Sequence, residues 1–400
     1  MIAGGLDISG DYIQMFGISR FTMMLDTNYF QSISYALIVI IAVIGLNNIV
    51  RQKYAYRPGI GAKLFLLFFL ASVIIGAVVG LINGNPISYI LGDSRNIIIY
   101  LALFAINDIK YEGFENKLYT LYFTVCAIVF LKLLIAISSF ALTMSSPLLV
   151  RFLLKLTPYF IGIALINAAF MAINYDRRNF IVFIVATISV VLSQTRGILL
   201  GYACGFLVLC MIIIYMKRGI RLIVPVITIL AMILLLAVGT WFNEEATQGR
   251  WTGDTFDDTV NIRLEQMDSF MNLFKSHPAF GIGLGGYDPE YLRFVPETSR
   301  PYLQELEFHN LLAKLGSIGI FLWICSFISL FYECWRRIKK STSLKLKGLI
   351  SGFMAGLVGM LVASATNPYY SSIYFHAYIV IILLLLSKAM RLHKAVYKGA

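Results

Sequence analysis

Charged residues are scarce in this 400-residue chain: Asp, Glu, Lys and Arg make up 14% of it, while hydrophobic residues make up 59%. An ordinary soluble domain carries about 25% charged and 45–50% apolar residues. A soluble protein must also cover its core with polar side chains, and this chain has too few of them. The composition therefore excludes a soluble enzyme and a disordered chain, and it indicates a polytopic helical membrane protein.

Cysteine is also scarce. The five cysteines all lie in apolar runs and form no CxxC pair, which excludes a disulfide scaffold and a cysteine metal site. No Walker motif and no strand-led glycine loop is present, so we expect no nucleotide, cofactor or metal. The net charge of +12 does not indicate nucleic-acid binding, because basic loop residues orient membrane helices.

Long apolar runs are what the sequence has instead. A membrane-crossing helix needs roughly 20 mostly apolar residues. The runs predict an all-α bundle of 11–12 spans, of which we identify these: 31–50, 64–82, 95–107, 118–142, 157–174, 179–195, 197–216, 221–242, 308–334, 347–366 and 371–388. A re-entrant segment near 84–107 stays open.

The placement of the basic residues predicts the orientation. With the N-terminus outside the cytoplasm, most of the 33 Lys and Arg residues fall in short cytoplasmic loops or in the C-terminal tail, and few acids join them. Three parts then follow: a bundle of eight spans over 1–242, an outer loop over 243–307, and spans nine to eleven with a tail over 308–400.

The outer loop is the longest connection, and connections of this length are usually functional. Apolar spacing predicts a surface helix with Ile262, Gln266, Phe270 and Leu273 on one face. We expect this helix to start at Asp257-Asp258 and to stop at His277-Pro278.

The turn over 281–287 follows, with Gly281, Gly283, Gly285 and Gly286. Its glycines can serve a structural turn or bring backbone N–H groups close to a ligand.

Three ionisable residues then stand out at the outer ends of helices. Arg196 lies in a short polar break between two apolar spans. Its side chain either snorkels to lipid headgroups or binds a phosphate through its planar guanidinium group. His309 opens the ninth span, as a structural cap or as a functional group, and Arg263 lies in the loop helix before it.

The motifs Ser193-Gln194-Thr195-Arg196-Gly197, Asn261-Ile262-Arg263-Leu264, His277 to Gly283, and His309-Asn310 followed by 315–319 occur in this order. In order and spacing they resemble the bacterial O-antigen ligase and O-antigen polymerase superfamily over roughly residues 180–330. That family consists of polytopic membrane glycosyltransferases.

The resemblance implies a glycan donor linked through diphosphate to undecaprenol, used at the outer face of the bacterial inner membrane. It implies that Arg196 and Arg263 bind the diphosphate and that His309 is the catalytic base. Asn310, Lys314, Arg300 and Glu307 are auxiliary candidates near these residues. The expected partners are membrane lipids, a lipid-linked glycan or lipid A-core acceptor, and a chain-length regulator protein, with no nucleic acid.

Three functions stay open. The residues favour a polymerase that extends a lipid-linked repeat, because no second feature points to recognition of the core. A ligase that joins the polymer to lipid A-core would use the same donor and the same three residues. A lipid-linked oligosaccharide transporter is the alternative from another class, although transport does not require so long an outer loop.

Overall fold

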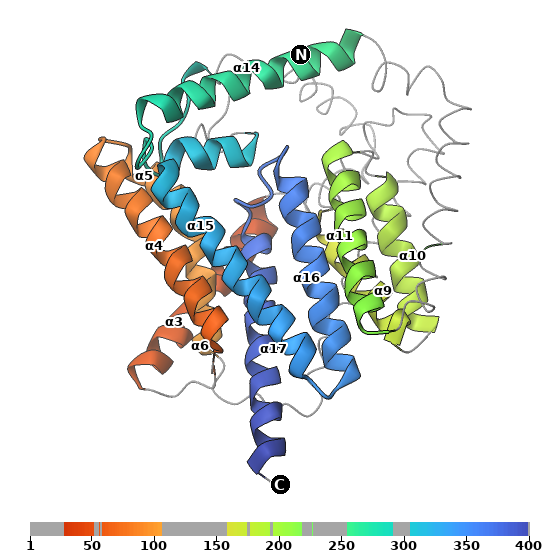
Figure 1. Cartoon of the computed structure of the whole chain (residues 1–400). Coiled ribbons are helices and arrows are strands. Elements are labelled where there is room, and N and C mark those ends of the chain that lie inside the picture. Colours follow the sequence, from red (N-terminus) through yellow and green to blue (C-terminus); the bar gives the residue numbers. More distant parts are fainter. Residues whose placement is uncertain are drawn as a thin grey trace.

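The structure is a computed structural model of the whole chain. It describes residues 28–51, 56, 58–105, 158–173, 177–192, 195–217, 226, 254–290 and 305–398. Every regular element in these ranges is a helix, so the predicted all-α polytopic bundle is confirmed (Figure 1). The helices are α3 Asn28–Val50, α4 Ile60–Ile82, α5 Ile87–Ser94, η1 Arg95–Leu101, α6 Ala102–Ala105, α9 Pro158–Ile173, α10 Arg177–Leu192, α11 Arg196–Tyr215, α14 Asp254–Ser276, α15 Glu307–Lys340, α16 Leu344–Ser364 and α17 Ile373–Lys398.

Five segments within the described ranges are long and apolar enough to cross a membrane. They are Ile60–Ile82, Ile87–Ala105, Arg196–Tyr215, Glu307–Lys340 and Leu344–Ser364. The expected spans at 31–50, 157–174, 179–195 and 371–388 are also helices, namely α3, α9, α10 and α17. The expected spans 118–142 and 221–242 lie outside the described residues except for Val226, so the total stays a prediction.

The segment 87–105 crosses the bundle and does not turn back. Its first helix, α5, lies at the end of the bundle that carries α14 (Figure 1), and Asn96 in η1 donates to the Ser371 carbonyl. At its other end the Asn48 amide, near the end of α3, donates to the carbonyls of Phe104 and Ala105. The open question of a re-entrant segment is therefore settled in favour of a crossing, made by α5, η1 and α6 in succession.

Helix α14 lies across the top of the bundle in Figure 1. It ends at Ser276, just before Pro278, as predicted. It begins at Asp254, so the predicted start at Asp257-Asp258 is wrong and both aspartates lie within the helix. Gln266 and Phe270 on its apolar face are buried, with 3% and 1% of their surface exposed, which confirms the amphipathic spacing.

Helix α15 is broken where the ninth span was expected to be continuous. Gly316 has φ 62° and ψ −173°, a conformation that only glycine adopts easily. The break separates a short segment, residues 307–315, from the long helix that runs down to the opposite end (Figure 1). A Cβ on Gly316 would come within 2.5 Å of the Ala279 carbonyl.

The loop after α14 supplies the hydrogen bonds that the break removes. The carbonyls of Ala313 and Lys314 accept from the backbone N–H groups of Ile282 and Gly283. In return, Ser317 and Ile318 donate to the carbonyls of Pro278 and Ala279. Non-helical backbone at membrane depth requires such partners, because lipid offers none.

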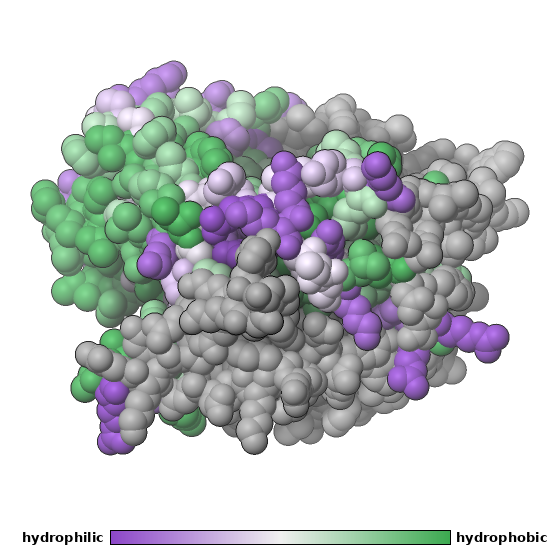
Figure 2. All heavy atoms as spheres, turned by 60° about the horizontal axis from the view of Figure 1, so that its bottom comes forward, coloured by the Kyte–Doolittle hydropathy of each residue, from purple (hydrophilic) through white to green (hydrophobic). Residues whose placement is uncertain are grey.

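Basic residues gather at the end of the bundle far from α14. Arg337, Lys339 and Lys340 occupy the last turn of α15. The buried Glu333 carboxylate binds Arg336 and Arg337, and it also accepts from Gly61 N at the start of α4. Figure 2 brings this end forward and shows hydrophilic side chains gathered on it. The His309 end and the basic end therefore lie on opposite sides of the bundle.

We predict that Gly316→Ala destabilises the protein by roughly 2–6 kcal/mol, since backbone strain and overpacking against Ala279 add together. Gly84→Ala is the matched control. Gly84 also has a positive φ of 75°, but nothing lies within 4 Å of its added Cβ. The control should lose only about 1 kcal/mol. Thermal unfolding in detergent measures both, and equal losses would contradict the proposed role of the contact with the loop.

Candidate functional site

The N-terminal segment of α15 has two chemically different sides. Its first side faces α14, where Phe270 packs against Leu306 and Ala313. Arg263, two turns before Phe270 on the same helix, forms an ion pair with Glu305 at 3.8 Å. Both partners are more than one-third exposed. The structure thus places Arg263 of the outer loop beside the start of α15.

His309 belongs to this first side. It precedes Ala313 by four residues, and residues four apart share a face of a helix. His309 is partly buried, and its Nδ1 atom is buried without a hydrogen-bond partner among the described residues. The structure therefore brings two of the three predicted site residues, Arg263 and His309, to one side of the same segment.

Arg196 is the first residue of α11 and is exposed. Its neighbour Gly197 lies against the end of α16, where an added Cβ would come within 2.2 Å of the Thr366 hydroxyl. Thr366 belongs to the connector 365–372 between α16 and α17, and Ser371 of this connector donates to Glu307 at the start of α15. Arg196 therefore lies at the same end of the bundle as His309, with the connector between their helices.

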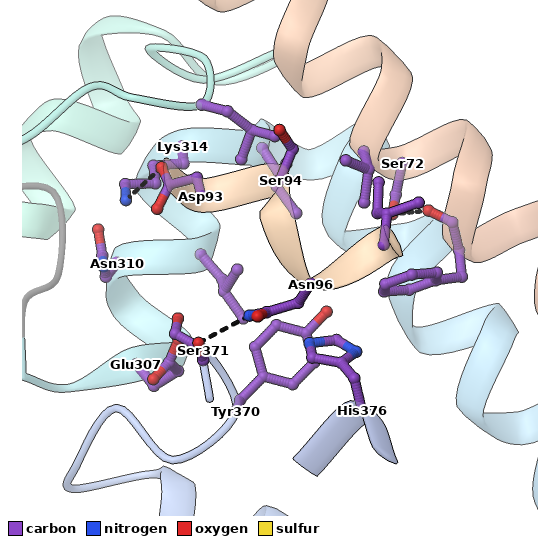
Figure 3. Close-up of a pocket in the computed structure, with 16 residues that line it drawn as sticks. Ser72, Asp93, Ser94, Asn96, Glu307, Asn310, Lys314, Tyr370, Ser371 and His376 are labelled. Atoms are coloured by element: carbon purple, nitrogen blue, oxygen red, sulfur yellow. Dashed lines mark hydrogen bonds and ion pairs between the residues drawn. The ribbon is translucent and has the colours of Figure 1, made fainter. Parts of the chain in front are cut away.

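The second side of the segment faces a small cavity, shown in Figure 3. Its volume is about 40 Å³, which is room for a few water molecules and too little for a sugar or a diphosphate. The cavity is lined by Phe69, Ser72, Val73, Asp93, Ser94, Asn96, Ile97, Leu284, Glu307, Asn310, Leu311, Lys314, Leu315, Tyr370, Ser371 and His376.

An ion pair closes one wall of this cavity. Lys314 Nζ lies 2.8 Å from Asp93 Oδ2, and both side chains are less than one-tenth exposed. Asp93 Oδ2 also accepts from Gly285 N at 2.7 Å. Lys314, an auxiliary candidate from the sequence, thus points away from the His309 side and has its charge balanced by Asp93 (Figure 3).

Glu307 and Asn310, two further auxiliary candidates, also line the cavity. The Glu307 side chain accepts from the Ser371 hydroxyl through Oε1, and its Oε2 atom has no partner among the described residues. Burial raises the pKa of the neighbouring Tyr370 phenol, so the phenol stays neutral. The remaining auxiliary candidate, Arg300, lies outside the described residues.

The glycine-rich turn is occupied by structural contacts. Gly281, Gly283 and Gly285 have φ between 70° and 82°, and backbone from α15, α4 and α5 respectively lies within 2.6 Å of where their Cβ atoms would be. Leu284 N donates to the Gly76 carbonyl, as Ile282, Gly283 and Gly285 donate to α15 and Asp93. These contacts favour the structural interpretation of the turn over a ligand contact.

Sequence reasoning missed Asp93, Asn96 and Ser371. All three come from segments far from His309 in the chain, so no spacing rule connects them with it. One signal was available, because Asp93 lies in a short polar stretch between two apolar stretches of a chain with only 21 acidic residues. A buried acid in such a position needs a cationic partner.

A comparison with protein families matches the part of the chain that holds the three predicted site residues. Residues 181–325 match the family model described as O-antigen ligase, a segment that includes Arg196, Arg263 and His309. The resemblance to the O-antigen ligase and polymerase superfamily is therefore confirmed for this segment. The class that the structure defines is a multi-pass helical membrane protein, and within it residues 181–325 are similar to the O-antigen ligase family. A comparison with curated proteins gave no match.

Breaking the buried ion pair tests its structural role. Asp93→Ala should destabilise the protein by about 3–5 kcal/mol, because it leaves the Lys314 ammonium buried without its carboxylate. The double variant with Lys314→Met should recover much of this loss, since the uncompensated charge is then gone. Thermal unfolding of the four proteins in detergent gives the coupling free energy. Additive losses would show that the two side chains do not depend on each other.

Proposed function

We propose that the protein is a membrane glycosyltransferase that moves a glycan from undecaprenyl diphosphate to an acceptor hydroxyl. In this reaction the bond between the anomeric carbon and the diphosphate breaks, and a glycosidic bond to the acceptor oxygen forms. The hydroxyl proton passes to His309, and undecaprenyl diphosphate leaves as an anion.

The observation that carries the proposal is the position of Arg263 and His309 on one side of the α15 segment, at the Arg196 end of the bundle. Arg263 can take up a diphosphate there because its present partner holds it weakly. An exposed ion pair such as Arg263–Glu305, at 3.8 Å, contributes only about 0–1 kcal/mol. A diphosphate offers two charges and several acceptor oxygens, so it can displace the Glu305 carboxylate.

The three side chains suit the chemistry. Guanidinium groups donate to phosphate oxygens through a planar fork, which fixes geometry as well as charge. Cations placed beside the leaving diphosphate stabilise the negative charge that develops as the bond breaks. Histidine ordinarily titrates near neutral pH, so His309 can accept a proton from the attacking hydroxyl. The donor carries its own activated bond, and ATP is not needed.

The orientation proposed from the sequence suits this reaction. The basic ends of α15 and α16 belong on the cytoplasmic side by the positive-inside rule. Arg196, Arg263 and His309, at the opposite end, then face the periplasm or the cell exterior. Under this proposal the protein resides in the bacterial inner membrane, and loop 243–307 carries part of the active site between the two membrane parts of the chain.

We propose the polymerase reaction first, with a second lipid-linked repeat as the acceptor. The family model's description, O-antigen ligase, favours transfer to lipid A-core as the second candidate. Both reactions use the donor and the three residues in the same way. A chain-length regulator protein is a partner only in the polymerase case.

Alanine at Arg196, Arg263 or His309 should each abolish long-chain surface glycan, because each removes a cation or the base from the transition state. The measurement is the glycan ladder on gels of whole-cell extracts, with membrane levels of the protein measured in parallel. Lys275→Ala, which removes an exposed cation from the same helix α14, is the matched control and should leave the ladder intact. Normal ladders from all three alanine variants would eliminate the proposed site.

Deleting the protein separates the candidate reactions. Loss of a polymerase leaves a single repeat on the core. Loss of a ligase leaves bare core, with polymer stranded on undecaprenyl diphosphate. Loss of a transporter instead leaves lipid-linked repeats on the cytoplasmic face, and this outcome would contradict the proposed enzyme.

A further inference from the structure

Gln266 is a buried amide without a structural partner for its oxygen. Only 3% of its surface is exposed, and its Oε1 atom has no hydrogen-bond partner among the described residues. Met267 and Phe270, which lie close to it in the sequence, belong to an apolar cluster between α14 and α15 that also includes Leu306. A buried polar atom that is left unpaired weakens a fold, so its retention there needs a reason.

The position of Gln266 along α14 is fixed by contacts on both sides of it. Arg263 precedes it by three residues and reaches Glu305, and Phe270 follows it by four residues and packs on Leu306 and Ala313. Residues spaced in this way share one face of a helix. Gln266 therefore faces the first turns of α15, between Glu305 and Ala313.

His309 presents the matching feature from α15. It shares a face with Ala313, the residue that Phe270 contacts, and its Nδ1 atom is also buried and without a partner among the described residues. Gln266 and His309 do not hydrogen-bond to each other. Two unpaired polar atoms in one helix–helix contact can both be satisfied by a polar group bound between the helices.

We propose that Gln266 and His309 bind the sugar that is bonded to the diphosphate of the lipid-linked substrate. Side chains three residues apart on a helix lie about 5–6 Å from each other, which matches the step from a phosphate on Arg263 to the sugar attached to it. The Gln266 carbonyl accepts a hydrogen bond from a hydroxyl of this sugar, and His309 Nδ1 faces a second polar group of the same sugar. This inference rests on the proposed function and adds Gln266 as a residue that binds the glycan part of the substrate.

Two lipids test the inference. Undecaprenyl diphosphate carries no sugar, whereas the lipid-linked repeat extracted from a strain lacking this protein carries the complete glycan. Gln266→Leu should weaken binding of the lipid-linked repeat by roughly tenfold, the effect of losing a single buried hydrogen bond of about 1.4 kcal/mol. Its affinity for undecaprenyl diphosphate should be unchanged. Affinities are measured on the purified full-length protein in nanodiscs.

Control variants distinguish a failure of this inference from a failure of the proposed function. Asn272→Leu makes the same amide-to-leucine change on the exposed face of α14 and should bind both lipids normally. Arg263→Ala should weaken both lipids, because it removes a diphosphate contact. If Arg263→Ala affects neither lipid, the proposed function fails. If it affects both while Gln266→Leu affects neither, or affects both equally, only the sugar contact is overturned.

A stability measurement excludes a purely structural role. Leucine fills nearly the volume of glutamine and removes the unpaired oxygen, so Gln266→Leu should unfold at the same temperature as the parent protein or at a higher one. A lower unfolding temperature together with weaker binding of both lipids would show that Gln266 serves the fold and would overturn the inference.

Discussion

The break in α15 at Gly316 is the constraint on which the rest of the outer end depends. A helix interrupted at membrane depth must find new partners for its backbone, and here they come from residues 278–283 of the outer loop. The exchange ties the end of α14 to the middle of α15, so α14 runs along the segment 307–315 and not away from it. Arg263 and His309 come together because of this attachment, although 46 positions separate them in the chain.

The attached segment divides its polar residues between two sides. One side lines a cavity of about 40 Å³, where the buried Asp93–Lys314 ion pair serves to fix the segment in place. On the other side His309 of the segment faces α14 and Gln266 of α14 faces the segment, each with a buried polar atom that no described residue satisfies. The ion pair on the cavity side holds the segment rigid, and the unpaired polar atoms lie on the α14 side. A rigid support behind unpaired polar atoms is suited to binding a ligand on the α14 side.

The sequence predicted the helices well because long apolar runs and a proline stop carry that information locally. It also predicted that α14 is amphipathic, since Gln266 and Phe270 repeat with the helical period. The break at Gly316 could not be predicted, because glycine is common inside membrane helices and only the loop that packs on it reveals its conformation. The Asp93–Lys314 ion pair could not be predicted either, since 221 positions separate the two residues and no spacing rule connects them. The start of α14 was misplaced because Asp257 and Asp258 suit a helix cap and the first turn equally well.

The central claim is that Arg196, Arg263 and His309 surround one diphosphate-binding space. The most direct measurement is a cryo-electron-microscopy structure of the full-length protein in nanodiscs with undecaprenyl diphosphate bound. The account predicts density for the diphosphate between the guanidinium groups of Arg196 and Arg263, beside the first turn of α15 and with His309 facing it. Diphosphate density at the basic end of the bundle, or an Arg196 side chain directed away from α14 and α15, would contradict the account.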